Sequence, residues 1–216
     1  SDILPMTLVT GTKRDALAGT ERKKARAVVC VHFQKQAPGE DLYTASADIT
    51  SVRAALAAAA HLWWGLKVIG VKTAFLNAPL PDHFEAVYVR PHQALIEFGL
   101  VKPGTVWRAL KAIYGLRVSP KAWGVERDKE MKNVTATHRG RKYKCEQSHI
   151  DPSIWSIVPS AGVPNASEEV GAAAMGCVAV YVDDFAIISD DPVAELVTQA
   201  IAKKWRITDK PAIKAG

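Results

Sequence analysis

Apolar and polar positions along the chain repeat with two different periods, and these periods predict the secondary structure. Short runs rich in valine and isoleucine are typical of strands. They predict strands at residues 27–33, 66–71, 87–90 and 154–158. Apolar side chains at helical spacing, preceded by capping residues, predict helices from Asp48 or Thr50 to about Gly65, from Ser119 to Met131, and over 193–205.

The order of these elements predicts the fold class. Strands and helices alternate irregularly, and several strands follow one another as hairpins would. This order favours an α+β layer over a doubly wound parallel sheet. Residues 1–20 show no periodicity and are expected to form a loose N-terminal segment.

Two apolar strands over residues 177–189 meet at adjacent acids in the run Tyr181-Val182-Asp183-Asp184. The pattern predicts a β-hairpin whose tip presents carboxylates. Aspartate is also common in turns for purely structural reasons. The chemical alternative is metal binding, because Mg²⁺ takes one or two carboxylates together with substrate phosphates, and two such ions can clamp a phosphoryl transfer. The hairpin alone leaves both interpretations open.

Composition narrows the class of protein. Of 216 residues, 48% are hydrophobic and 23% are charged, which excludes a disordered or fibrous chain. Lys and Arg number 28 against 22 Asp and Glu, so the net charge of +6 suits a polyanionic partner. No uncharged apolar run is long enough to cross a membrane, no signal peptide pattern is present, and cysteines are few. We therefore expect a soluble, intracellular chain without a membrane partner.

Four blocks carry a resemblance to a known family. In chain order they are Lys24-Ala25-Arg26, Val71 to Asn77, Leu110 to Leu116 with Ser119 to Trp123, and Tyr181 to Asp184. Their order and mutual spacing resemble the reverse transcriptase of copia-type LTR retrotransposons. The resemblance runs from about residue 22 to near the C-terminus.

The resemblance implies the fingers and palm of a right-hand polymerase over residues 21–216, with an antiparallel palm sheet and without thumb, connection or ribonuclease H. The implied reaction is RNA-directed DNA polymerisation, in which deoxynucleotides are added to a primer 3′-hydroxyl and pyrophosphate is released. The implied partners are an RNA template, a DNA primer and deoxynucleoside triphosphates, and the implied cofactors are two Mg²⁺ or Mn²⁺ ions. The family's life cycle implies a cytoplasmic particle or the nucleus. The oligomeric state is left open.

The resemblance also assigns roles to single residues. Asp183 and Asp184 match the catalytic metal-binding acids. The ring of Phe75 would lie under the incoming sugar and favour deoxynucleotides, and backbone N–H groups beside it would face the triphosphate. The full nucleotide-binding set is Lys24, Arg26, Lys72, Thr73, Ala74 and Phe75. Without the resemblance, Lys24 and Arg26 are equally well explained as a solvated charge run.

Two positions depart from the family pattern. Gly70 stands where the family has an aspartate that bridges both metal ions, and Val118 stands where it has a glutamine. Among nearby acids, Asp82 and Glu85 lie beyond the turn and Asp48 precedes a helix, so none is an obvious substitute. The hypothesis is that the chain folds as a reverse transcriptase but polymerises poorly or not at all. The alternatives are a non-catalytic nucleic-acid-binding module and a decayed remnant of a mobile element.

Other candidate sites are weaker. Cys145 and His149 have the spacing of a zinc knuckle, but a structural zinc site needs four ligands and only His138 lies nearby. The basic run 139–144 is suited to tracking a nucleic-acid backbone. We expect the tryptophans at positions 107, 123 and 155 to be packing residues.

Overall fold

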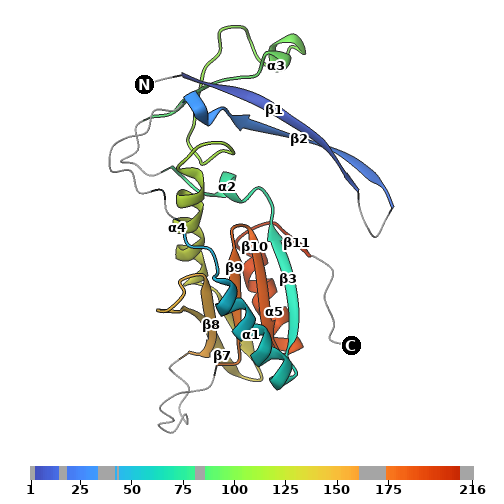
Figure 1. The fold of residues 1–216 in the computed structure, drawn as a ribbon, viewed down its shortest axis with the longest axis vertical. Coiled ribbons are helices and arrows are strands. Elements are labelled where there is room, and N and C mark those ends of the chain that lie inside the picture. The colour runs from blue at the N-terminus through green and yellow to red at the C-terminus, as the bar shows by residue number, and fades with distance from the viewer. Residues whose placement is uncertain are drawn as a thin grey trace. The chain divides into compact units, whose positions relative to one another are not determined.

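The computed structural model describes residues 3–14, 19–33, 42, 44–80, 86–160 and 174–209 (Figure 1). The chain forms two compact units. Unit 1 comprises Ser1–Tyr43 and Phe75–Trp123, and unit 2 comprises Thr44–Ala74 and Gly124–Gly216. Each unit is therefore assembled from two separate stretches of the sequence.

Unit 1 contains a four-stranded sheet in the order β2-β1-β4-β5. Its strands are β1 (Ile3–Arg14), β2 (Glu21–Val29), β4 (Tyr88–Arg90) and β5 (Trp107–Arg108). β1 and β2 form a long antiparallel hairpin, and β4 runs parallel to β1. Three short helices accompany the sheet: η1 (Val31–Phe33), α2 (Ala74–Asn77), which begins in unit 2, and α3 (Gln93–Glu97).

Two expectations about the first thirty residues are wrong. The segment expected to be loose forms β1, because Leu4 and Met6 alternate with exposed or half-buried neighbours and are buried in the core of unit 1. Proline at position 5 and glycine at position 11 mask this period in the sequence. The strand expected over 27–33 is instead Glu21–Val29, followed by η1, so the basic run belongs to a strand.

Gly115 fixes the connection between β2 and the segment that follows β5. Its φ is +95°, and a Cβ at this position would lie 2.0 Å from the carbonyl oxygen of Val29. The Val29 N–H donates to the carbonyl of Tyr114 at 2.8 Å. Only glycine combines this φ with so close an approach of two backbones.

Unit 2 contains a seven-stranded sheet in the order β11-β3-β10-β9-β8-β7-β6, in which every pairing is antiparallel. The strands are β3 (Gly65–Val71), β6 (Thr135–His138), β7 (Arg141–Gln147), β8 (Ile154–Pro159), β9 (Gly176–Tyr181), β10 (Asp184–Ser189) and β11 (Ile207–Asp209). The expected combination of an antiparallel sheet with packed helices, the α+β class, is therefore confirmed.

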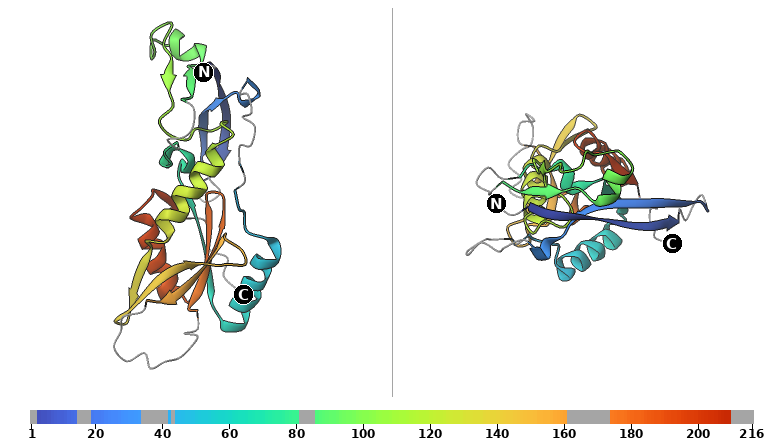
Figure 2. Two further views of the ribbon diagram at one scale, coloured as in Figure 1. Left: turned by 90° about the vertical axis from the view of Figure 1, so that its left-hand side faces the viewer. Right: turned by 90° about the horizontal axis from the view of Figure 1, so that it is seen from above.

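Three helices accompany this sheet: α1 (Ile49–Leu62), α4 (Ser119–Met131), whose first five residues belong to unit 1, and α5 (Asp191–Ala202). α1 and α5 lie on opposite faces of the sheet (Figures 1 and 2). All three match helices that the sequence predicts. The expected cap of α1 is also confirmed: Asp48 accepts a hydrogen bond from the Thr50 N–H at 2.8 Å, and this interaction lowers the pKa of its carboxyl group.

Candidate functional site

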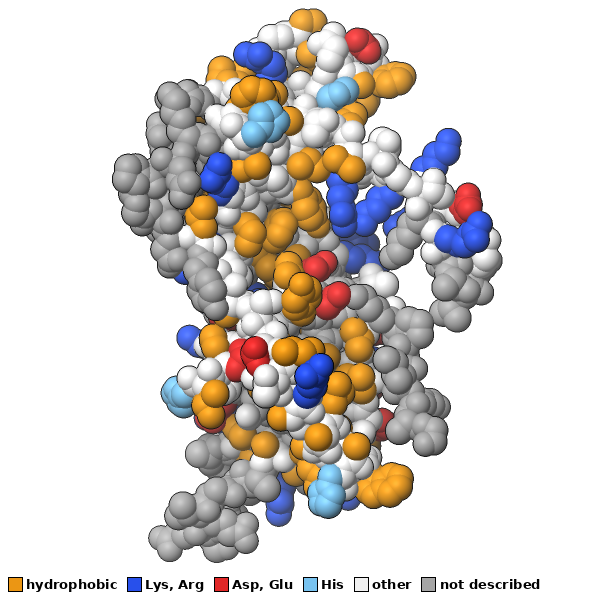
Figure 3. Space-filling model, in the orientation of Figure 1, with side chains coloured by type: hydrophobic (Ala, Val, Ile, Leu, Met, Phe, Trp, Pro, Cys, Tyr) orange, Lys and Arg blue, Asp and Glu red, His pale blue; other side chains and the backbone are white. Residues whose placement is uncertain are grey.

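The predicted acidic hairpin is present in unit 2. Tyr181 and Asp184 are opposite each other at the ends of β9 and β10, and Val182 and Asp183 form the two-residue tip. Val182 has a φ of +54°, a left-handed conformation that a β-branched side chain rarely adopts. Backbone strain of this kind gathers at functional sites. Acidic side chains reach the surface at this end of the hairpin (Figure 3).

Gly70 lies directly beside this hairpin. β3 runs between β10 and β11, so that Gly70 is opposite Asp184 on one side and Thr208 on the other. The Val71 N–H donates to the carbonyl of Asp183 at 2.8 Å, which holds the tip against the end of β3. Residues directly opposite in a ladder project from the same face. A side chain at position 70 would therefore lie beside the carboxylate of Asp184.

Two carboxylates lie at the tip of this hairpin, and carboxylates are suitable ligands for a divalent cation. Asp183 and Asp184 are both half-buried, and the described residues include no group of three His, Cys, Asp or Glu side chains that could hold a metal. Asp48 caps α1, whereas Asp82 and Glu85 lie outside the described residues. Mg²⁺ takes one or two carboxylates together with substrate oxygens. At this tip the described residues therefore supply two carboxylates to such an ion, one fewer than the family pattern implies.

The turn after β3 carries three of the expected nucleotide-binding residues. Lys72 is exposed, and its N–H donates to the carbonyl of Arg206 at 2.8 Å. Thr73 has a φ of +51°, and its hydroxyl donates to the carbonyl of Lys72 at 2.7 Å. Ala74 is buried. The turn is thus joined to the segment before β11 by one backbone hydrogen bond.

The other expected nucleotide-binding residues, Lys24, Arg26 and Phe75, belong to unit 1, and two of them contact Tyr114. Lys24 and Arg26 are exposed on β2, and cationic side chains gather along this hairpin in Figure 3. The guanidinium carbon of Arg26 lies 5.0 Å from the centroid of the Tyr114 ring. The Phe75 ring lies 4.9 Å from the same ring at 56°. The resemblance assigns no role to Tyr114, although this residue lies inside the matched block 110–116.

Val118 is a core residue. It is completely buried in an apolar cluster of unit 1 that includes Val29, Val89 and Leu116. A glutamine amide at this depth would have to find hydrogen-bond partners within that cluster. The side chain at position 118 is therefore suited to packing and does not reach solvent.

We expect Val118→Gln to lower the free energy of unfolding by about 1 to 3 kcal/mol, the usual cost of burying an amide without partners. Urea denaturation of the variant beside the native chain measures this change. Val118→Ile is the matched control, since it keeps the position apolar and is expected to stay within about 1.5 kcal/mol of the native value. Equal stability of the glutamine and isoleucine variants would show that position 118 has polar partners.

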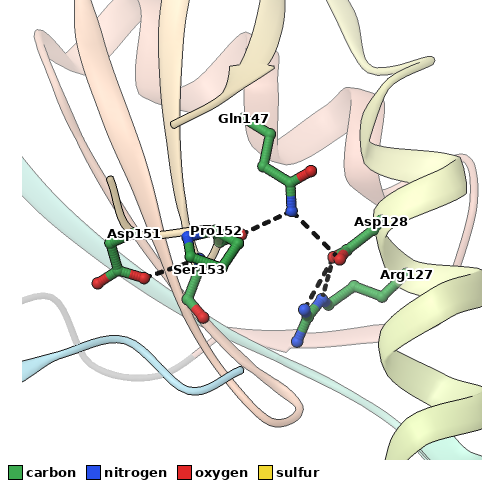
Figure 4. Close-up of polar contacts among 6 residues, drawn as sticks. All are labelled: Arg127, Asp128, Gln147, Asp151, Pro152 and Ser153. Carbon is green, nitrogen blue, oxygen red and sulfur yellow. Dashed lines mark hydrogen bonds and ion pairs between the residues drawn. The ribbon is translucent and has the colours of Figure 1, made fainter. Parts of the chain in front are cut away.

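A polar network in unit 2 surrounds the buried side chain of Arg127 (Figure 4). The Arg127 side chain is only 1% exposed, and its Nε and Nη2 both donate to Asp128 Oδ1 at 2.8 Å. Gln147 Nε2 donates to Asp128 Oδ2 at 3.2 Å and to the carbonyl of Pro152 at 2.7 Å. These contacts join α4 to the turn between β7 and β8.

The same turn is linked to the start of α1 and to β9. Asp151 accepts hydrogen bonds from the N–H groups of Asp48 and Ser153, both at 2.9 Å. The Val180 N–H, one residue before Tyr181, donates to the carbonyl of Ser153 at 2.9 Å. Through Val180 the network therefore positions the strand that leads to the acidic tip.

The zinc hypothesis gains no support from the geometry. Cys145 is buried, and burial raises the pKa of its thiol to about 12, whereas zinc binds the thiolate. Cys145 and His149 line an open pocket of about 400 Å³ together with Lys132, Lys144, Glu146 and Gln147. A pocket with two lysines and one ligating histidine is unsuited to a structural zinc ion.

Comparisons with known proteins support the resemblance, and the match to a family model includes the first three of the four blocks. A family model described as reverse transcriptase (RNA-dependent DNA polymerase) matches residues 2–145. The chain is 32% identical over 124 residues to the retrovirus-related Pol polyprotein from transposon TNT 1-94 of Nicotiana tabacum, covering 57% of this chain and 9% of that protein. It is 34% identical over 108 residues to the corresponding polyprotein from transposon RE2 of Arabidopsis thaliana, covering 49% of this chain and 7% of that protein.

The chain thus spans less than a tenth of the length of these relatives. In the part of the chain that the structure describes, no helix is both long and apolar enough to cross a membrane.

Proposed function

Because the chain belongs to the reverse transcriptase (RNA-dependent DNA polymerase) family, we propose that it is the polymerase part of a retrotransposon Pol polyprotein and that Gly70 makes it a slow one. The observation that carries this proposal is the register of β3, which sets Gly70 opposite Asp184 beside the acidic tip. Within the proposal, unit 2 is the palm and unit 1 the fingers. Because β1 (Ile3–Arg14) pairs with β2 and β4 in the sheet of unit 1, the proposed polymerase domain includes it and is not limited to the expected residues 21–216.

In the proposed reaction the chain's own residues bind and orient the substrates. Asp183 and Asp184 would hold one divalent cation, Mg²⁺ or Mn²⁺. Such an ion, when bound, activates the primer 3′-hydroxyl and shields the phosphates of the incoming nucleotide. Fixed charges and dipoles do most of the work in phosphoryl transfer, so the rate depends on how firmly this end of the sheet is held. The hydrogen bond from Val71 to Asp183 and the ladder to Asp184 supply that rigidity.

The proposed role of unit 1 is to bind the nucleotide. The guanidinium of Arg26 can donate two hydrogen bonds to the oxygens of one phosphate, and Lys24 adds a second positive charge. The proposed role of the Phe75 ring is to exclude nucleotides with a 2′-hydroxyl by steric collision. Tyr114 contacts both Arg26 and Phe75 through its ring, so it would hold the phosphate-binding and sugar-selecting side chains in a fixed relation. Lys72, Thr73 and Ala74, which belong to unit 2, are the remaining residues that we propose to bind the nucleotide.

The proposed partners follow from the same assignment. An RNA template, a DNA primer and deoxynucleoside triphosphates are the substrates, and the intracellular location of the element's particle remains part of the proposal.

The test uses the variant in which the missing carboxylate is supplied. Gly70→Asp is expected to extend a DNA primer on an RNA template with deoxynucleotides and Mg²⁺. Adding Asp183→Asn to that variant is expected to abolish extension, because the substitution removes a ligand charge without changing side-chain size. Extension that persists in the double variant, or that proceeds without a template, would contradict the proposed function.

A further inference from the structure

A second charged surface lies on unit 2, on the hairpin formed by β6 and β7. We propose that this basic hairpin, residues 132–147, binds the phosphate backbone of a nucleic acid at a site separate from the acidic tip. The inference goes beyond the proposed polymerase reaction and does not depend on it, because it rests on the charges and register of this hairpin alone.

The exposed face of the hairpin carries matched pairs of hydroxyl and ammonium groups. Thr135 is opposite Lys144, and Thr137 is opposite Lys142. The alternate face holds Ala136 and Tyr143, which are buried, so the threonines and lysines project away from the core. Successive lysines on one face of a strand are about 7 Å apart. Threonine hydroxyls and lysine ammonium groups are both common partners of phosphate oxygens.

The cations of this hairpin exceed the acids that could neutralise them. Glu146 pairs with Lys144 at 2.6 Å, and Glu130 of α4 pairs with Lys204 at 2.8 Å. Within the described ranges, Lys132, Arg139, Arg141 and Lys142 form no ion pair. Lys132 and Lys144, with His149, also line the open pocket of about 400 Å³ at the end of the hairpin, which has room for a phosphate group.

The turn of the hairpin is built at some conformational cost to place an arginine at its tip. Arg139 and Gly140 both have positive φ, +48° and +76°, between the paired residues His138 and Arg141. Turns of this kind favour Asn-Gly or Asp-Gly. Arg139 occupies the first turn position, where Asn or Asp is favoured. It adds a positive charge next to Arg141 and Lys142 in the sequence.

A nucleic acid fits these groups better than an acidic protein does. The hairpin presents a regular row of cations and hydroxyls, and the chain as a whole has a net charge of +6. Tyr143 is buried, so its ring is not available for a base to stack on, and we expect contacts at this hairpin mainly through phosphates. Contacts through phosphates alone give binding that is independent of sequence and strongly dependent on salt.

The test is the salt dependence of binding to a fluorescent 20-nucleotide oligouridine RNA, followed by anisotropy between 25 and 200 mM NaCl. The variant Arg139→Asn, Arg141→Gln, Lys142→Gln removes three cations and keeps a residue at 139 that tolerates positive φ. We expect the slope of log K against log salt to fall by about 2, at about 0.7 for each lost phosphate contact, and affinity at 50 mM to fall about tenfold or more.

The matched control removes three exposed cations elsewhere, through Arg53→Gln, Lys102→Gln and Lys203→Gln. It is expected to keep the native slope. An unchanged slope in the hairpin variant, or an equal loss in the control, would overturn the proposal. Equal competition by polyglutamate and RNA would also overturn it, since the partner would then be an acidic protein. Primer extension by Gly70→Asp with and without the hairpin variant distinguishes this surface from the polymerase site, because extension is expected to survive.

Discussion

Replacing Gly70 with aspartate is expected to raise the rate of Mg²⁺-dependent primer extension about 100-fold or more over the native chain, which corresponds to about 3 kcal/mol of activation free energy. The reason is geometric. Position 70 faces Asp184 across the ladder, so a carboxylate there adds a third charged ligand beside the acidic tip. Extension on an RNA template, measured for both chains at equal concentration, gives the ratio directly.

Stability supplies a second measurement of the same change. Without metal, an aspartate opposite Asp184 places like charges across a strand pair and is expected to lower the free energy of unfolding by up to about 1 kcal/mol. Added Mg²⁺ is expected to raise the melting temperature of Gly70→Asp more than that of the native chain, because binding to the folded state stabilises it. Gly70→Asn is the matched control, since it adds the same bulk without charge. Comparable gains in rate from asparagine and aspartate would refute the assignment of position 70.

Asp128→Ala is expected to lower the free energy of unfolding by about 3 to 5 kcal/mol, the cost of leaving a buried charge without its partner. Asp128 is the carboxylate partner of a guanidinium that is 1% exposed, and Nη1 of Arg127 already has no hydrogen-bond partner. Arg127→Met is expected to cost less, because Asp128 is 28% exposed and keeps contact with water. Urea denaturation of both variants measures this asymmetry.

Two further variants make the result interpretable. Combining Arg127→Met with Asp128→Ala is expected to recover part of the stability lost by Asp128→Ala, since no buried charge remains. Glu126→Ala is the control on the same helix, because its pair with the exposed Lys129 at 3.5 Å is worth less than about 1 kcal/mol. Similar losses from Glu126→Ala and Asp128→Ala would mean that the buried guanidinium is not what makes Asp128 important.

Local signals in the sequence predicted local structure well. Asp48 caps α1 as predicted, and adjacent acids between two apolar strands correctly predicted the hairpin of β9 and β10. The start of α4 at Ser119 was also predicted, but the Ser119 hydroxyl bonds to the backbone of Ile113 and does not cap the helix. Trp123 and Trp155 are buried as expected, whereas Trp107 is 39% exposed. The exposure of Trp107 could not be predicted, because the burial of a tryptophan depends on which distant segments pack against it, and the neighbouring residues do not indicate this.

Features that depend on distant partners could not be predicted in the same way. The pairing of Gly70 with both Asp184 and Thr208 is a matter of register between strands more than 100 residues apart. The contacts of Tyr114 with Arg26 and Phe75 join three blocks that the sequence presents separately. The metal, nucleotide and partner assignments of the individual residues remain predictions, to be decided by the experiments above.

The place of β3 between β10 and β11 has a consequence for synthesis on the ribosome. β3 is complete at Val71, yet the strands on either side of it, β10 and β11, are complete only at Ser189 and Asp209. At translation rates of about 5–20 residues per second, both edges of this apolar strand stay unpaired for on the order of 10 s. An unpaired apolar edge is a template for association with other chains. We therefore expect β3 to be exposed to association with other chains until β10 and β11 have been synthesised.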